Sequence, residues 1–214
     1  MTRKIFWQDP YRTAHKTRVS AVDKEHVCLE ETIFFAFSGG QESDSGTLAG
    51  VSVLAAEKNG SDIVYTLPPD HGLQVGCEVE ILIDWERRYR LMRLHFAAEM
   101  VLQLVYQLHP GIERIGAHIA ADKARIDFAY AESIAVLFPQ IEARVETLLT
   151  AGLPIVTAFS DEVVERRYWE VEGFARMACG GTHPRSTSEI GALKLKRKNI
   201  GKGKERIEIT LVRM

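Results

Sequence analysis

The feature that most constrains the fold of this chain is a long apolar stretch near its middle. Residues 86–108 contain neither glycine nor proline, and apolar side chains occupy most faces of a helical wheel rather than one stripe. A helix that is apolar on most faces is a buried one, so this stretch predicts a helix at the centre of a domain. Pro110 and Gly111 follow it and predict its end. The apolar positions are Leu91, Met92, Leu94, Phe96, Ala97, Met100, Val101, Leu104, Val105 and Leu108.

The part of the chain before this helix has a different pattern. Short strand-like runs alternate there with turn residues such as Gly46 and Asn59-Gly60, which is typical of a small β-barrel. We therefore expect an N-terminal β-barrel-like domain over residues 1–84 and a second domain over residues 85–214. The expected strands of the first domain are Val27–Leu29, Thr32–Phe37, Thr47–Leu54, Ile63–Leu67 and Glu78–Ile83.

Beyond the buried helix, helical and strand-like patterns mix without a regular β-α-β repeat. Phe138–Thr150 predicts an amphipathic helix, with Pro139 near its start and Gly152 beyond its end. A short helix is expected over Asp161–Arg167. A buried helix combined with antiparallel hairpins indicates an α+β domain. The expected strands are Arg114–Ala120, Ala124–Phe128, Pro154–Phe159, Ala192–Lys198 and Arg206–Val212.

Composition and cysteine usage limit the classes of function. With 214 residues, of which 46% are hydrophobic, the chain can bury a core without disulfides. Its three cysteines are an odd and scattered number, which favours a reducing, cytoplasmic location, and Cys28 and Cys77 are expected in the core. No apolar run approaches the ~18 residues that span a bilayer, so no membrane partner is expected. A net charge of −2 argues against a protein that coats nucleic acid, and no DNA partner is expected.

Two short motifs carry donor atoms typical of a metal site. His95 and Glu99 are four residues apart on the buried helix, so their side chains share one face. Cys179 and His183 are separated by Gly-Gly-Thr, so a thiolate and an imidazole can turn toward one cation. Nitrogen, sulfur and carboxylate oxygen together form a plausible zinc ligand set. Two structural alternatives stay open: Glu99 pairs with a nearby arginine beside a core histidine, and the glycines form an ordinary turn.

Positive charge is concentrated near the C-terminus. Residues 192–206 hold seven lysines and arginines against one acid, Glu205, a local charge of +6. Such a cluster can contact the phosphate backbone of a nucleic acid. The alternative is a solvent-exposed edge hairpin whose lysines prevent pairing with other strands. The cations are Lys194, Lys196, Arg197, Lys198, Lys202, Lys204 and Arg206.

Five segments, taken in order, resemble the editing domain of alanyl-tRNA synthetase and its free-standing relatives, the AlaX-type alanyl-tRNA editing proteins. They are Thr32–Gly46, Ile83–Met100, Ala124–Phe128, Cys179–His183 and Ser188–Val212, and they span nearly the whole chain. The chain is too short to include an aminoacylation domain as well. The resemblance therefore implies the free-standing, mid-length form with an N-terminal barrel.

The same resemblance implies one zinc ion per chain. In the family, zinc is held by two helix histidines and by the cysteine and histidine of a Cys-Gly-Gly-Thr-His motif. Carried over, the ligands are His95, Cys179 and His183, and Glu99 stands at the position of the second helix histidine. A carboxylate oxygen also ligates zinc, so Glu99 is included in the expected set. Residues implied in catalysis or substrate binding are Gly39, Gly40, Gln41, His118 and Thr182.

The function that the resemblance implies is hydrolysis of mischarged tRNA(Ala) in trans, with serine or glycine as the amino acid removed. The basic residues between positions 194 and 206 are the expected tRNA contacts. An alternative is a tRNA-binding or regulatory module that keeps the fold and has lost hydrolysis, with Glu99 as the mark of that loss. A hydrolase for another aminoacyl-tRNA is a third alternative, since threonyl-tRNA synthetase carries a related editing domain.

Overall fold

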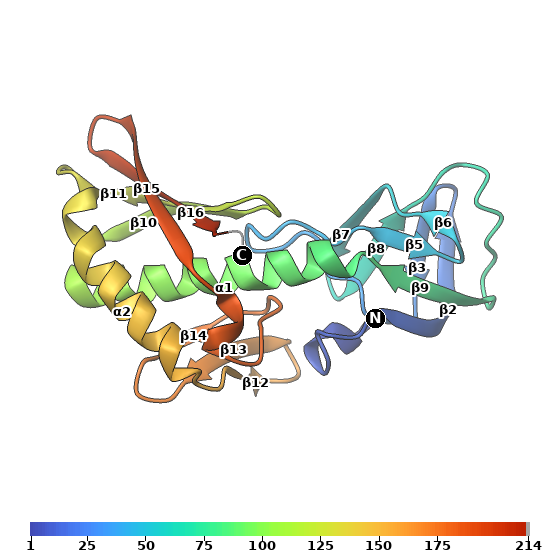
Figure 1. Cartoon of the computed structure of the whole chain (residues 1–214). Coiled ribbons are helices and arrows are strands. Elements are labelled where there is room, and N and C mark those ends of the chain that lie inside the picture. The colour runs from blue at the N-terminus through green and yellow to red at the C-terminus, as the bar shows by residue number, and fades with distance from the viewer. Residues whose placement is uncertain (213–214) are drawn as a thin grey trace. The chain divides into compact units, whose positions relative to one another are not determined.

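The computed structural model describes residues 1–212, so the last two residues of the expected second domain lie outside it. The chain divides into two compact units, residues 1–89 and the part from Arg90 onward, which are described in turn. Helices and strands occur together and the sheets are mainly antiparallel (Figure 1), which confirms the expected mixture of α and β structure.

The first unit is built on one curled sheet. Its strand order is β6-β5-β9-β2-β3-β8-β7, and within the described residues the two outer strands, β6 and β7, do not pair with each other. The sheet is thus a curled half-barrel, so the barrel-like curl that the sequence predicts is present without closure of the barrel. The elements of this unit are β1 (Arg3–Lys4), a 3-10 turn η1 (Ile5–Trp7), β2 (Ala14–Asp23), β3 (His26–Leu29), β4 (Glu31–Thr32), β5 (Gly46–Leu48), β6 (Val51–Ser52), β7 (Ala55–Asn59), β8 (Asp62–Thr66) and β9 (Glu78–Ile83).

The expected strand Thr32–Phe37 forms a strand only at its first residue, as the end of β4. Ile33, Phe34, Phe35 and Ala36 are buried and Phe37 is exposed. Side chains satisfy two of the backbone donors of this segment in place of a neighbouring strand. The Thr32 hydroxyl accepts from the Phe34 amide at 2.9 Å, and the Asp44 carboxylate accepts from the Phe35 amide at 2.6 Å. An apolar run therefore marks burial here and not sheet pairing.

Asp44 also anchors a buried cation. Arg88 is fully buried, and its Nε donates to Asp44 Oδ1 at 2.7 Å. Its remaining donors reach the backbone carbonyls of Pro10 and Ile33 at 2.9 and 2.5 Å. A buried charge is tolerated only when paired and hydrogen-bonded, and this guanidinium meets both conditions.

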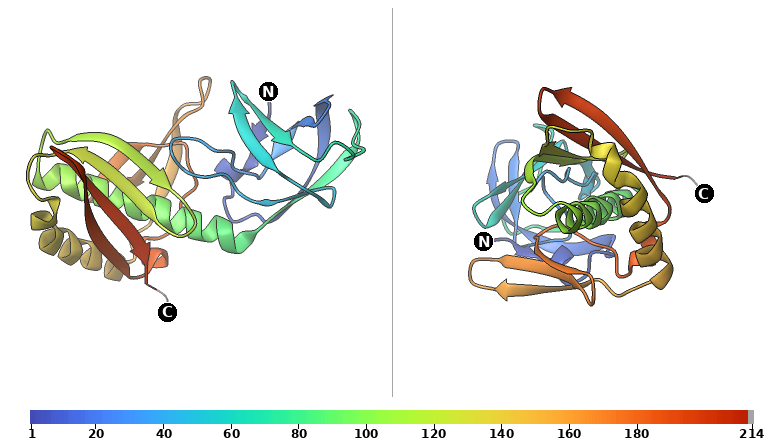
Figure 2. Two further views of the ribbon diagram at one scale, coloured as in Figure 1. Left: turned by 90° about the horizontal axis from the view of Figure 1, so that it is seen from above. Right: turned by 90° about the vertical axis from the view of Figure 1, so that its left-hand side faces the viewer.

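The second unit surrounds the predicted central helix. Helix α1 (Trp85–Leu108) begins in the first unit, and from Leu91 onward nearly all its apolar residues are buried. Seen along α1, the sheet β10-β11-β16-β15 lies on one side and the sheet β12-β13-β14 on the other (Figure 2). The remaining elements are β10 (Glu113–Ile119), β11 (Ala124–Ala129), η2 (Ile134–Leu137), α2 (Phe138–Ala151), β12 (Val156–Asp161), β13 (Arg166–Val171), β14 (Ala175–Ala178), η3 (Thr187–Ile190), β15 (Leu193–Gly201) and β16 (Lys204–Leu211).

The expected short helix Asp161–Arg167 is wrong. The structure has a β-hairpin there, because Asp161 Oδ1 accepts from the amides of Val163 and Val164 at 3.0 and 3.3 Å and closes a turn. Glu165 then adopts a positive φ of 53°, which breaks any helix and leads directly into β13.

Burial tests the expectation for two of the cysteines. Cys28 on β3 is partly buried, but Cys77 is exposed, because it lies in the turn that precedes β9 rather than in the core. No helix within residues 1–212 is long and apolar enough to cross a membrane.

Candidate functional site

Four side chains from two distant parts of the second unit converge. His95 and Glu99 lie one turn apart on the buried helix α1. Cys179 directly follows β14, and its amide donates to the carbonyl of Arg167 on β13 at 3.0 Å, which fixes the start of the Gly-rich turn. His183 closes that turn, and its ring stacks on that of His95 with the centroids 4.9 Å apart. We call His95, Glu99, Cys179 and His183 the donor cluster.

The donor cluster has the spacing that a single cation requires. One ligand atom from each residue lies within 4.8 Å of the others. His95 Nε2 is 3.6 Å from Cys179 Sγ and 3.4 Å from Glu99 Oε1, and His183 Nε2 is 2.9 Å from Glu99 Oε2. Tetrahedral zinc with bonds of ~2.0–2.3 Å separates its ligand atoms by ~3.3–3.8 Å. The separations of 3.4 and 3.6 Å lie in this range, and the donor types are those that zinc binds in proteins.

Hydrogen bonds around the donor cluster orient its members. The backbone carbonyl of Thr182 lies 3.3 Å from His95 Nδ1, and a carbonyl only accepts, so Nδ1 carries the proton and Nε2 faces the cluster. The Gly181 amide donates to Cys179 Sγ at 3.3 Å, which favours the thiolate. Within the described residues His183 Nδ1 is buried without a hydrogen-bond partner, so this ring lacks the support that His95 has.

The electrostatics of the donor cluster favour charged forms. Burial alone raises the pKa of Glu99, but the charge of His95 and hydrogen bonds from His183 and His95 hold that pKa well below its usual range. Burial lowers the pKa of His95, yet Glu99 and Cys179 raise it well above its usual value. The pKa of Cys179 is lowered, since the two imidazoles outweigh burial and Glu99. A metal ion that bound here would displace the imidazole protons.

Aromatic side chains wall the donor cluster. Phe96 packs edge-on against both His183 and the fully buried Trp169, with ring centroids 5.9 and 4.9 Å away. Such rings exclude water and strengthen the electrostatic interactions beside them.

Arg167 is a buried residue beside the donor cluster that the sequence did not single out. Its guanidinium lies over the Phe159 ring, 4.4 Å from the centroid, and burial lowers its pKa while the charge of Cys179 opposes that shift. The signal was present but weak: Arg167 alternates with the buried Trp169 and Val171 along β13, so its side chain shares their buried face.

The Gly39-Gly40 pair and Gln41 belong to the first unit. Ser38 and Gln41 exchange backbone hydrogen bonds of 3.2 and 3.0 Å across the two glycines, whose φ values are 61° and 88°. Positive φ at both central residues makes a tight hairpin turn that strongly favours glycine. The Gln41 side chain is buried, at 1% exposure.

His118 and Thr182 have different surroundings. Thr182 is buried within the Cys179–His183 turn and serves His95 through its carbonyl. His118 pairs with Arg125 between the core pairs Ala117–Ile126 and Ile119–Ala124, so it points to the other face of the sheet. That face lies away from α1, which carries His95 and Glu99, so a contact between His118 and the substrate amino acid stays a prediction.

A cavity of about 470 Å³ lies between α2 and the start of β15, away from the donor cluster. None of the cluster residues contributes to its lining. Its walls are Glu142, Val145, Glu146, Leu149, Thr150, Gly191, Ala192, Leu193 and Leu195.

The sequence of this chain is similar to known proteins over nearly its whole length. Residues 168–208, which include Cys179 and His183, match the family model described as the threonyl and alanyl tRNA synthetase second additional domain. The alanyl-tRNA editing protein AlaX-M of Pyrococcus horikoshii is 33% identical over 99% of this chain and 98% of its own length. AlaX-M of Methanosarcina barkeri is 32% identical over 99% of this chain and 100% of its own length. The alanine–tRNA ligase of Pyrobaculum arsenaticum is 31% identical over 92% of this chain but over 25% of its own length.

The matched family model thus describes a domain of the threonyl and alanyl tRNA synthetases. The chain itself belongs to the AlaX-M family of alanyl-tRNA editing proteins.

Proposed function

We propose that this chain is an aminoacyl-tRNA hydrolase that edits mischarged tRNA(Ala) in trans. The observation that carries the proposal is the convergence of the donor cluster in a chain similar over its whole length to AlaX-M proteins. The bond broken is the ester between the amino acid and the terminal ribose of the tRNA. Water supplies the hydroxyl, and the free amino acid and the tRNA leave.

The roles of the chain's residues follow from their positions. His95, Cys179, His183 and Glu99 would hold one zinc ion, which supplies Lewis acidity or an activated water when bound. The Thr182 carbonyl orients His95, and Phe96 excludes water from one side of the donor cluster. Gly39, Gly40 and Gln41 of the first unit stay proposed substrate contacts, because backbone amides and a side-chain amide can donate to an oxyanion.

The test is deacylation of Ser-tRNA(Ala) by zinc-loaded protein and by protein treated with a chelator. We expect hydrolysis well above the background rate in the loaded protein and its loss after chelation, with recovery when zinc is restored. Hydrolysis no faster than background in fully loaded protein would contradict the proposal.

The choice of amino acid is tested with three substrates that share one tRNA. We expect hydrolysis of Ser-tRNA(Ala) or of Gly-tRNA(Ala), and little hydrolysis of Ala-tRNA(Ala). Serine carries a hydroxyl that alanine lacks, and a polar partner in the site is needed to favour it, because a purely apolar pocket separates such pairs by only ~100-fold. Equal rates on all three substrates would contradict an editing role.

The variant Glu99→His separates editing from the alternative of an inactive tRNA-binding module. If the parent chain hydrolyses Ser-tRNA(Ala), Glu99 is compatible with catalysis. If only the Glu99→His protein is active, the parent chain has lost hydrolysis through this substitution, and the module alternative holds.

A further inference from the structure

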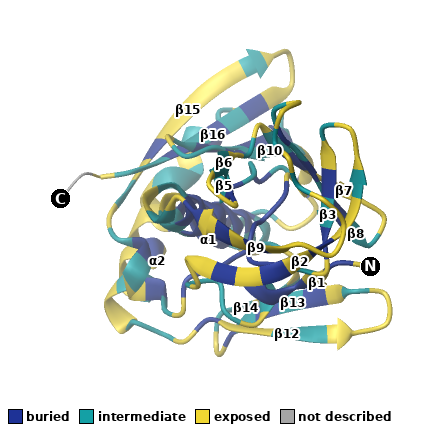
Figure 3. Ribbon diagram, turned by 90° about the vertical axis from the view of Figure 1, so that its right-hand side faces the viewer, coloured by how far each residue is buried: buried dark blue, intermediate teal, exposed yellow. Residues whose placement is uncertain are grey.

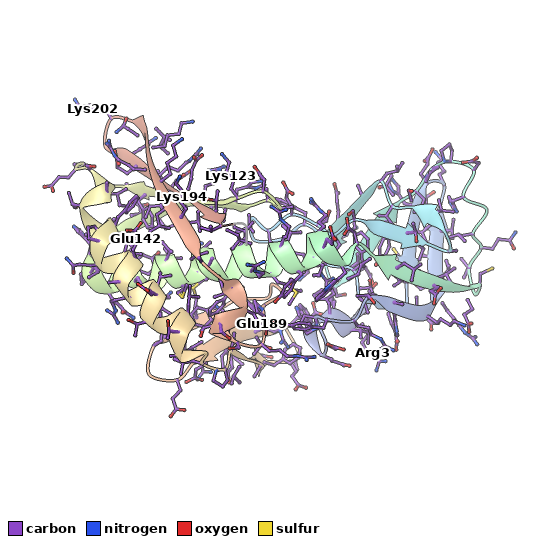
Figure 4. All side chains as sticks on the ribbon, viewed as in Figure 1. Arg3, Lys123, Glu142, Glu189, Lys194 and Lys202 are labelled. Carbon is purple, nitrogen blue, oxygen red and sulfur yellow. The ribbon has the colours of Figure 1, made fainter. Side chains whose placement is uncertain are left out.

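The basic hairpin β15-β16 separates into groups once the strand register is known. Leu195, Ile207 and Ile209 belong to the core, so residues that alternate with them point away from α1. Lys194, Lys196 and Lys198 are therefore exposed side by side along β15, which is largely exposed (Figure 3). Arg197 lies on the opposite face, and Lys202 lies at the hairpin tip (Figure 4).

Two arginines of the hairpin are already committed to ion pairs within the sheet. Arg197 donates to Glu205 at 2.5 and 2.7 Å, and Arg206 donates to Asp127 at 2.6 and 2.9 Å. The sequence grouped all seven cations as tRNA contacts. The strand register shows that the three lysines of β15 form an evenly spaced row on one face.

Neighbouring strands extend this row into a surface. Arg125 on β11 pairs in register with Glu208, which pairs in register with Lys196, and Arg125 also bonds Asp127. Lys123 donates to Glu208 at 2.8 Å. The charges of this surface sum to +4 in a chain whose net charge is −2. We call it the basic platform and define it as Lys123, Arg125, Asp127, Lys194, Lys196, Lys198, Arg206 and Glu208.

Protection of a sheet edge accounts for the three lysines on β15 but not for the other cations of the basic platform. Edge protection needs charges on the outermost strand, which is β15. Arg206 and Arg125 lie on β16 and β11, which are paired on both sides and have no edge to protect. Lys198 is also directly opposite Arg206, and like charges in that position destabilise a sheet. The concentration of cations therefore points to a polyanionic partner.

We propose that the basic platform binds the phosphate backbone of an RNA duplex. The identity of this duplex rests on the proposed function, which makes it a helical stem of the tRNA. Alternate residues of a strand are ~6.6 Å apart, so the three lysines form a straight, regular row of cations. The strands of this sheet hold one large aromatic residue, Phe128, and it belongs to the core, so apart from the imidazole of His118 their outer face offers no ring for base stacking. Backbone contact without base stacking is the mode used on duplex RNA.

The test measures binding of deacylated tRNA(Ala), a short RNA hairpin and a single-stranded RNA of equal length over a salt series. The variant is Lys194→Gln/Lys196→Gln/Lys198→Gln. We expect its affinity for the tRNA and the hairpin to fall at least about tenfold at 0.1 M salt, and the log–log salt slope to fall by ~2, since each phosphate contact contributes ~0.7–0.9. We expect the parent chain to prefer the hairpin to the single strand.

Two control proteins make the result specific. Lys194→Arg/Lys196→Arg/Lys198→Arg keeps the charges and is expected to keep affinity and slope. Lys16→Gln/Arg18→Gln/Lys24→Gln removes three exposed charges from the first unit, two of them also alternating along a strand, and is expected to bind as the parent does.

Unchanged affinity and slope in the β15 variant would overturn the platform, as would an equal loss in the first-unit control. Binding of the parent to phosphatidylserine vesicles but to none of the RNAs would overturn it as well. Deacylated tRNA carries no ester, so this binding result is independent of hydrolysis. A platform that binds tRNA in a protein inactive on Ser-tRNA(Ala) would leave the platform standing and refute the hydrolase.

Discussion

Glu99 distinguishes this donor cluster from a cluster of three imidazoles and a thiolate. Its two carboxylate oxygens face different histidines, with Oε1 3.4 Å from His95 and Oε2 2.9 Å from His183. The side chain is therefore placed either to bind a cation directly or to hold both rings in position.

Glu99→Gln tests whether the carboxylate takes part in zinc binding at all, because it keeps the shape of the side chain and removes its charge. We expect zinc affinity to fall at least about tenfold, the loss that follows even when a group supporting a ligand is changed. Competition with a chromogenic chelator measures the affinity. Glu142→Gln, an exposed change on α2, is the control. A Glu99→Gln protein that binds zinc as tightly as the parent would show that the carboxylate is not a ligand.

Gly46 supports the first unit through a close backbone approach. A Cβ at this position would lie 2.1 Å from the carbonyl oxygen of Leu82 on β9, a distance at which the two strands must separate. We expect Gly46→Ala to lower the free energy of unfolding by about 3 kcal/mol or more, because the β5–β9 pairing is lost. Gly50→Ala is the control: it places a Cβ in open space at a φ of 80°, so it tests backbone strain alone, at about 1–3 kcal/mol. Equal losses in the two variants, measured by urea unfolding, would contradict the steric explanation.

At the scale of elements, the β15–β16 hairpin depends on a buried carboxylate. Glu205 is 1% exposed and accepts from Arg197 and Asn199, and from the amide of Ile134 at 3.3 Å at the start of η2. The hydrogen bonds from Arg197 lower the pKa of Glu205 to about 2. Since an unfolded glutamate has a pKa of ~4.3, the stabilisation is complete above about pH 5 and is lost as the pH falls through about 2.

Glu205→Gln is accordingly expected to lower the free energy of unfolding at pH 7 by about 1–3 kcal/mol, because donors to a buried charge lose their acceptor. Between about pH 5 and pH 2 its stability is expected to fall less steeply than that of the parent. Thermal unfolding followed across this range checks both points. A parallel pH dependence in the two proteins would show that Glu205 does not carry the effect.

The two long helices were predictable because each is defined by its own residues. Apolar periodicity and the flanking Pro110 and Gly152 placed both helices to within one or two residues. The segment at Asp161 was not predictable in this way, because one side-chain oxygen accepting two amides decided between a helix and a hairpin. Likewise β14 was missed, since its four residues gain their structure from pairing with β13.

For the donor cluster, spacing along the chain grouped His95 with Glu99 and Cys179 with His183. The structure brings the two groups together, in accord with the expected ligand set, while their role as ligands stays a prediction. The support from the Thr182 carbonyl and the burial of Arg167 depend on tertiary packing, which no local pattern encodes. The division of the basic hairpin between two faces likewise required the strand register.

At the scale of the whole molecule, the donor cluster lies entirely in the second unit, so metal removal should act there. A ligand that binds only the folded state stabilises it by about 4 kcal/mol at a thousand times its dissociation constant. We expect chelation to increase amide hydrogen exchange in residues 95–105 and 175–190, while β2, β3 and β8 keep their protection. Hydrogen exchange of zinc-loaded and chelated protein, resolved by peptide, measures this. Uniform loss of protection over both units would contradict a metal site confined to the second.

The pairing of a thiolate with a carboxylate in the donor cluster affects how a polyanion would approach the molecule. Cys179 and Glu99 contribute two negative charges, which cancel those of a divalent ion, whereas a histidine at position 99 would leave one positive charge. A neutral centre would exert no long-range attraction, and in a chain of net charge −2 the proposed attraction of RNA would then come from the basic platform. Capture of RNA from solution would then slow steeply as added salt shortens the Debye length, while the ester-cleavage step at the buried cluster would respond little to salt.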